Sequence, residues 1–143
     1  MSALTLSQAQ TIVTTALAHA RGEKFQPLAV LVLDARGVPK AFAAEDGTSL
    51  RRYEIAHGKA HGALAMGIGS RTLGKRAEER PQFIAAVTHA VGGALVPVPG
   101  GVLIRDTDRA IIGAVGISGD SSDNDEAAAV AGIAAAGLSA DPG

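Results

Sequence analysis

The stretch that decides the fold is PLAVLVLDARGVPKAFAAEDG, residues 27–47. Its first part, residues 28–34, is a continuous apolar run that follows a proline, which is typical of a strand buried on both faces. The turn signal DARG comes next, and a second strand-like run covers residues 38–45. Two such runs joined by a short turn predict an antiparallel hairpin, with its first strand in the centre of a sheet.

A helix is expected before this hairpin. The sequence TLSQ, residues 5–8, is a capping box in which Thr5 is the N-cap and Gln8 is the third helical residue. Apolar residues then recur at helical spacing until Gly22. The N-terminal segment therefore predicts one amphipathic helix that packs on the sheet.

Helical patterns also follow the hairpin. A second helix is expected for residues 50–66, with Ser49 as its cap. Residues 71–80 read as a short polar helix or a loop. A third helix begins at Pro81, which suits the first helical position, and it stops at the glycine pair 92–93.

The last third of the chain returns to strands. A final helix, capped by Ser122 or Asp123, precedes a tail at residues 139–143 that we expect to be loose. The order α-β-β-α-α-β-β-β-α indicates an α+β fold with a five-stranded antiparallel sheet, in one domain over residues 1–143. Three apolar runs separated by the turn signals PVPGG and DTDR predict the remaining strands, at residues 94–96, 102–105 and 111–118.

Composition excludes several classes of protein. Without cysteine, the chain has no disulfide framework, thiolate zinc site, iron–sulfur cluster or cysteine nucleophile. A net charge of −1, with one tyrosine and three phenylalanines, argues against nucleic acid as a partner. No export signal or long apolar run is present, so we expect a soluble, cytoplasmic protein with no membrane partner.

The second expected helix carries the candidate site in EIAHGKAHGALAMG, residues 54–67. His57 and His61 lie about 6 Å apart along the helix axis, on the same side as Glu54, with Tyr53 nearby. Such a pair can hold a metal or serve as haem-iron ligands, since histidine is a usual axial ligand and cysteine is absent. Glu54 is a weaker candidate ligand. The structural alternative is that both histidines pack at a helix or subunit interface.

The same helix contains Gly58 and Gly62, each of which costs roughly 1 kcal/mol relative to alanine in a helix interior. This cost predicts that another backbone or a ligand approaches that face closely. Lys59, between them, can project toward an anionic ligand such as a carboxylate, or it can be a surface lysine. The PVPGG turn, with Pro99, Gly100 and Gly101, can cradle a ligand or simply turn the chain.

The chain resembles a known family in three segments, which occur in the same order and at similar spacing. The segments are LAVLVLDARGVPKAFAAEDG, RRYEIAHGKAHGALAMG and VPVPGGVLIRDTDRAIIGAVGISGDSSDNDEAAAVAGI. They resemble the GlcG/HbpS-like haem-binding family, which is related to the C-terminal domain of PduO-type corrinoid adenosyltransferases. The resemblance implies a profilin-like α-β-α sandwich that assembles as a homo-dimer or a larger homo-oligomer.

The resemblance also bears on the site. Lys59 falls at the KA motif of the family, and the loops PGG and GISG match loops expected to line a pocket near a subunit contact. His57 and His61 occur in only part of the family, so the motif carries no haem role onto them. Gly58 and Gly62 would then let their helix approach a partner element across an oligomer interface.

Three functions stay open at this point. The first is binding of haem or a related tetrapyrrole, with or without haem degradation, in which His57 or His61 is the axial ligand and Lys59 pairs with a propionate. The second is an accessory enzyme or a binding protein for a small carboxylate, anchored by Lys59, with a histidine as acid or base. The third is a structural assembly module without a ligand.

Overall fold

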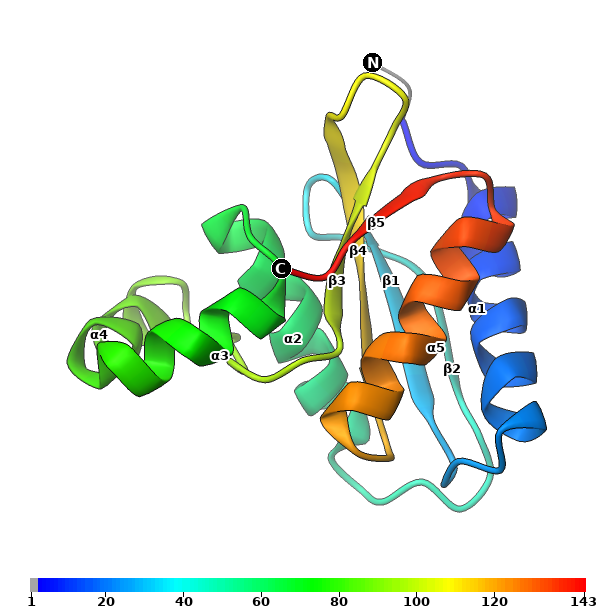
Figure 1. The fold of residues 1–143 in the computed structure, drawn as a ribbon, viewed down its shortest axis with the longest axis horizontal. Coiled ribbons are helices and arrows are strands. Elements are labelled where there is room, and N and C mark those ends of the chain that lie inside the picture. Colours follow the sequence, from blue (N-terminus) through cyan, green and yellow to red (C-terminus); the bar gives the residue numbers. More distant parts are fainter. Residues whose placement is uncertain (1–2) are drawn as a thin grey trace.

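A computed structural model describes residues 3–143 of the chain and has an α+β architecture. Five antiparallel strands form one sheet in the order β2-β1-β4-β3-β5, with helices on both of its faces (Figure 1). The elements along the chain are α1 (Leu6–Gly22), β1 (Ala29–Asp34), β2 (Pro39–Ala44), α2 (Arg52–Met66), α3 (Ser70–Glu79), α4 (Pro81–Ala90), β3 (Gly101–Arg105), β4 (Ile111–Ser118), α5 (Ser122–Ala135) and β5 (Ser139–Asp141).

Strand β1 lies inside the sheet, between β2 and β4, as its apolar run predicts. Its side chains alternate between two cores. Val30 and Val32 join the core beneath α1 and α5, whereas Leu31 and Leu33 join the core beneath α2. The uninterrupted hydrophobic run is therefore explained by helices on both faces of one strand.

The two helical layers are unequal. Helices α1 and α5 lie side by side on one face of the sheet, and α2 covers the other face alone (Figure 1). Helix α2 packs on β1, β3 and β4 through its small residues Ala56, Ala60 and Ala63, which are fully buried. Helices α3 and α4 form an arm that extends away from the sheet beside α2 (Figure 1).

The predicted fold class is confirmed, but one strand of the sheet was misplaced. Residues 94–96 form no strand in the structure; they are an irregular segment in which the Val96 amide donates to the Gly58 carbonyl oxygen at 3.1 Å. The fifth strand lies instead in the tail that we expected to be loose. Strand β5 pairs with β3, and Arg105 Nε donates to Asp141 Oδ2 at 2.8 Å.

The predicted caps of two helices differ from expectation, whereas the capping box of α1 and the start of α4 at Pro81 are confirmed. Helix α2 begins at Arg52, and Ser49 does not cap it but accepts a hydrogen bond from the Arg52 side chain. Helix α5 is capped by Ser121, whose hydroxyl accepts from the Asn124 amide. The polar segment at residues 71–80 is helical and forms most of α3. Among residues 3–143, no helix is long and apolar enough to span a bilayer.

Candidate functional site

Four rings form a continuous row, here called the aromatic strip: Phe42, Tyr53, His57 and His61. Phe42 packs edge-on against Tyr53, with 5.0 Å between ring centroids. Tyr53 stacks on His57 at 5.9 Å, and His57 stacks on His61 at 5.3 Å. The three α2 residues follow helical spacing, and Phe42 comes from β2, so the strip joins a helix to an edge strand of the sheet.

The strip is open to solvent because α2 does not extend over β2. Phe42 pairs with Leu31 in the sheet and so faces the α2 side, but α2 packs on β1, β4 and β3 instead. Phe42 is consequently 42% exposed and Tyr53 is 37% exposed. Exposed aromatic rings beside polar groups with fixed orientation are a common feature of ligand-binding surfaces.

His61 is fixed by a hydrogen bond of 2.8 Å between its Nδ1 and the carbonyl oxygen of Ala94. A carbonyl oxygen only accepts, so Nδ1 carries the proton and donates it. In the neutral ring, the other nitrogen, Nε2, is then unprotonated and has a lone pair. This arrangement, in which one nitrogen donates to the backbone and the other is free, is the one that metal-ligating histidines adopt.

The environment of His57 favours its neutral form. Partial burial lowers its pKa below the ordinary value of 6.5, and the neighbouring His61 lowers it further. The two imidazoles are inclined by 25° and stack on one face of α2. Two rings placed in this way cannot reach one metal ion from opposite sides.

Glu54, the weaker candidate ligand, has a different environment. It is exposed, and its Oε2 forms an ion pair with Arg51 Nη1 at 3.1 Å. Within the described part of the chain, no group of three histidine or carboxylate side chains is arranged to hold a metal ion. Glu54 therefore does not join the two histidines in a three-ligand metal site.

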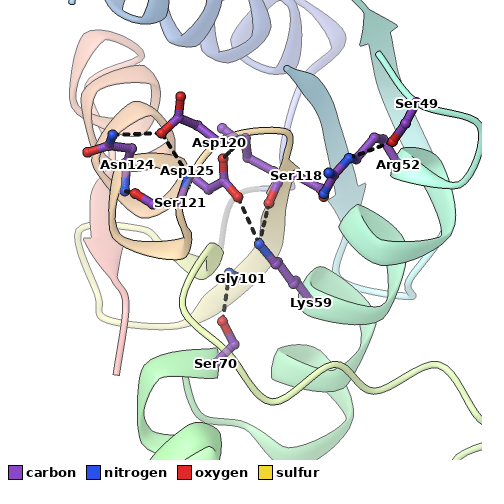
Figure 2. Close-up of polar contacts among 11 residues, drawn as sticks. Ser49, Arg52, Lys59, Ser70, Gly101, Ser118, Asp120, Ser121, Asn124 and Asp125 are labelled. Carbon is purple, nitrogen blue, oxygen red and sulfur yellow. Dashed lines mark hydrogen bonds and ion pairs between the residues drawn. The ribbon is translucent and has the colours of Figure 1, made fainter. Parts of the chain in front are cut away.

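Lys59 lies apart from the strip, in the interior. Its Nζ donates to Asp125 Oδ2 at 3.0 Å and to the Ile117 carbonyl oxygen at 2.9 Å (Figure 2). The Lys59 and Asp125 side chains are only 3% and 2% exposed. Because α2 and α5 cover opposite faces of the sheet, this ion pair connects the two helical layers around the ends of β3 and β4.

Burial favours the uncharged form of both partners. It lowers the pKa of Lys59 and raises the pKa of Asp125, and the attraction between the two groups opposes both shifts. The ammonium group is thus neutralised within the protein. It presents no free positive charge to an anionic ligand in this conformation.

The PVPGG loop is divided between two environments. Gly100 and Gly101 lie against α2, and a Cβ at Gly101 would be 2.2 Å from the Lys59 carbonyl oxygen, so only glycine fits there. The Gly101 amide donates to Ser70 Oγ at 2.7 Å (Figure 2). Pro99 instead lines a cavity of about 550 Å³ beside α3. The loop therefore does not bring all three residues to one site.

Gly58 and Gly62 are explained within the chain itself. A Cβ at Gly58 would lie 2.5 Å from Val96 Cγ2, and a Cβ at Gly62 would lie 2.9 Å from Leu95 Cγ. The sequence correctly indicated a close approach on this face. The expectation that the approaching element belongs to another subunit was wrong, since residues 95–96 of the same chain occupy that face.

The sequence reasoning missed the partners of the buried lysine. Asp125 lies two residues after Asp123, one of the two expected N-caps, and the sequence indicated no role for it beyond the first turn of that helix. Its Oδ1 also accepts from the Asp120 amide at 3.0 Å, so the carboxylate stabilises the turn before α5 as well as Lys59. No local signal identifies a partner that is 66 residues away in the chain.

These features define a small α+β protein with one exposed aromatic strip that includes a metal-competent histidine. Comparison with protein families matches residues 4–134 to the HbpS-like family, described as haem degrading protein HbpS-like. The chain belongs to this family.

Solved structures share the fold. A PduOC–haem complex is 26% identical to this chain, covers 96% of it and 97% of its own length, and has a TM-score of 0.85. The structure of HbpS is 26% identical, covers 94% of this chain and 90% of its own, and has a TM-score of 0.79. The Klebsiella pneumoniae protein ORFY is 20% identical over 96% of this chain and 92% of its own, has a TM-score of 0.85, and supports the fold alone. No curated protein sequence matches the chain significantly.

Proposed function

We propose that this protein binds haem on the aromatic strip, with His61 as the axial ligand of the iron. The observation that carries the proposal is the hydrogen bond from His61 Nδ1 to the Ala94 carbonyl oxygen, which leaves Nε2 free to coordinate. The similarity to a haem-bound structure, and membership of a family described as haem degrading, support the same ligand.

His61 is favoured over His57 by its fixed ring. The backbone carbonyl sets both the tautomer and the orientation of His61, whereas no hydrogen bond from the protein orients the His57 ring among the described residues. The role of His57 is to pack against His61 and to remain uncharged beside it. Tyr53 and Phe42 supply apolar surface for the porphyrin. Bound haem would provide a redox-active iron, which these residues hold and shield from water on one side.

The test is a titration of the purified protein with haemin, followed by visible absorption, for wild type and the variants His57→Ala and His61→Ala. We expect a saturable Soret shift in wild type. In His61→Ala the axial ligand is lost. The Soret shift should then disappear, or the Soret band should lie at the wavelength that a different axial ligand gives. In His57→Ala the ligand remains, so the Soret position should be kept with weaker affinity.

The matched control is His89→Ala, which removes an exposed histidine at the end of α4. It should bind haemin as wild type does. An unchanged spectrum in His61→Ala, or an equal loss in His89→Ala, would overturn the assignment. Adding a reductant in air to the complex tests haem degradation, because cleavage of the macrocycle removes the Soret band whereas binding alone preserves it.

The geometry gives less support to Lys59 as a carboxylate anchor. A ligand could use Lys59 only by displacing Asp125, and this would leave a buried carboxylate without its partner. The pair is better explained as a structural link between α2 and α5.

Self-assembly is a further part of the proposal. Helix α4 packs against α3 through Ile84 and leaves Phe83 43% exposed, so the arm has an apolar side that a second subunit could cover. Light scattering after size exclusion tests this directly. We expect a mass of at least two chains, and a Phe83→Ser variant should shift the mass toward one chain.

A further inference from the structure

Arg52, the first residue of α2, is an arginine whose charge has no partner. Its Nε donates to Ser49 Oγ at 2.9 Å, and its Nη1 donates to Ser118 Oγ at 3.0 Å (Figure 2). Both acceptors are neutral hydroxyl groups. Across residues 3–143, no carboxylate lies within ion-pair distance of its guanidinium group.

The other half-buried arginines of the chain are different. Arg71 forms ion pairs with Asp123 and Glu126, and Arg105 forms an ion pair with Asp141. Those exposed arginines that have no carboxylate partner lie in water, which solvates their charge. Arg52 alone among the described arginines combines partial burial with an uncompensated charge. Partial burial reduces the hydration of this charge, so a ligand that supplies a negative charge would stabilise it.

The two serines also fix the direction of the guanidinium group. An arginine side chain has five N–H donors in a planar fork, and the serines occupy two of them. Three donors remain without a protein acceptor among the described residues. A planar fork held by two hydrogen bonds is pre-organised for a planar anion, and a carboxylate is the anion whose geometry it matches.

We propose that Arg52, positioned by Ser49 and Ser118, is a binding site for a carboxylate group. Burial is the main cause of the lowered pKa of Lys59, and the charge of Arg52 lowers that pKa a little further. A carboxylate at Arg52 would offset that repulsion. Asp125 already neutralises the charge of Lys59. The positive charge without a carboxylate partner is therefore that of Arg52.

The carboxylate could belong to a free small acid or to a propionate of haem. Successive helical residues are rotated by about 100°, so Arg52 lies about 140° around α2 from His57 and about 180° from His61. This separation places the Arg52 site on a different side of α2 from the aromatic strip and favours a separate small acid. The inference does not depend on the proposed haem function, except in the propionate case.

The test begins with wild-type protein labelled with ¹⁵N. Sodium acetate is titrated at pH 7 while the Nε–Hε resonances of the arginines are recorded, and sodium chloride at equal ionic strength is the reference. We expect a saturable shift of the Arg52 resonance with acetate only, together with a rise in melting temperature. Arg52→Gln should weaken acetate binding by about ten-fold or more, since a charge-assisted hydrogen bond is lost. Arg52→Lys, which keeps the charge but not the fork, should lie between the two.

The control variant is Arg76→Gln, which removes an exposed arginine of α3 that has no carboxylate partner. It should respond to acetate as wild type does. Because Arg52→Gln also loses contacts to two serines, the wild-type resonance shift is the decisive readout if that variant folds poorly.

A second arm distinguishes the source of the carboxylate. Haemin and haemin dimethyl ester, whose propionates are blocked, are compared in wild type and Arg52→Gln. If wild type binds haemin more tightly than the ester and Arg52→Gln does not, the carboxylate at Arg52 is a haem propionate. If Arg52 responds to acetate but not to haemin, the carboxylate belongs to a free acid. If neither acetate nor haemin acts on Arg52 more than chloride does, Arg52 is only a structural link and the proposal fails. Failure of haemin to bind leaves the acetate arm intact, so the two proposals fail separately.

Discussion

Lys59 on α2 and Asp125 on α5 form an ion pair of 3.0 Å that is almost completely buried, although 66 residues separate them in the chain. Lys59 belongs to the helical layer on one face of the sheet, and Asp125 belongs to the layer on the other face. Their side chains meet around the ends of β3 and β4. The pair is therefore a buried polar contact between the two helical layers, and its chemistry leads to the first prediction.

Removal of one partner should destabilise the protein strongly. Lys59→Met leaves the Asp125 carboxylate buried without a counter-charge, and the expected loss in the free energy of unfolding is about 3–5 kcal/mol. The double variant Lys59→Met, Asp125→Leu removes both charges and should recover most of that loss. Urea denaturation measures both values. An equal loss in the single and double variants would show that packing, rather than charge, explains the effect.

The exposed ion pair between Arg51 and Glu54 provides the control for this experiment. The side chains of Arg51 and Glu54 are 73% and 54% exposed, so water already solvates both charges. Arg51→Gln should leave the urea midpoint unchanged. A loss comparable to that of Lys59→Met would indicate that burial is not the cause.

The second prediction concerns the close approach of α2 to residues 95–96. Gly58→Ala improves helix propensity but places a methyl group 2.5 Å from Val96 Cγ2, so we expect net destabilisation. Val96→Ala makes room for the methyl group. The double variant Gly58→Ala, Val96→Ala should therefore lose less free energy of unfolding than the two single variants lose in sum. Urea denaturation of the four proteins in this double-mutant cycle measures the difference.

Gly22 offers a matched control for the glycine prediction. It ends α1, and a Cβ there would meet no atom within 4 Å. Gly22→Ala should be neutral or slightly stabilising. Additive behaviour of Gly58→Ala and Val96→Ala would mean that the two sites do not interact, contrary to the structure.

The third prediction is the acid sensitivity of the aromatic strip. The folded pKa of His57 is lowered below 6.5 by burial and then by His61, so the folded protein binds this proton more weakly than the unfolded chain does. The contribution of His57 to stability is therefore present above pH 6.5 and is lost as the pH falls through the folded pKa. Proton NMR should give a His57 pKa below 6.5.

In the His61→Gln variant, the folded pKa of His57 should move upward, because His61 is the second cause of its lowered value and is removed. Burial is the larger cause, so the return toward 6.5 should be incomplete. A His57 pKa at or above 6.5 in the wild-type protein would contradict the burial of the ring.

Local sequence signals predicted those elements whose stability depends on nearby residues. The apolar run of β1 specified a strand buried on both faces, and the capping box of Thr5 and Gln8 specified the start of α1. The i and i+4 spacing of His57 and His61 placed them on one face of a helix. These predictions succeed because strand burial, capping and helical spacing act over a few residues.

Contacts between distant segments were decided only by the tertiary structure. Residues 94–96 are Ala-Leu-Val and residues 139–141 are Ser-Ala-Asp, so the first segment is the more apolar, yet only the second reaches the free edge of β3. The same holds for the charges of α2. Asp125 neutralises Lys59, whereas no carboxylate among the described residues neutralises Arg52. No local sequence signal distinguishes these two cations. The sequence by itself determined four of the five strands, four of the five helices and the position of the histidines on one face of α2. The pairing of charges depended on which distant side chains the fold brings within a few ångströms, because electrostatic attraction and steric fit depend on distance in space rather than along the chain.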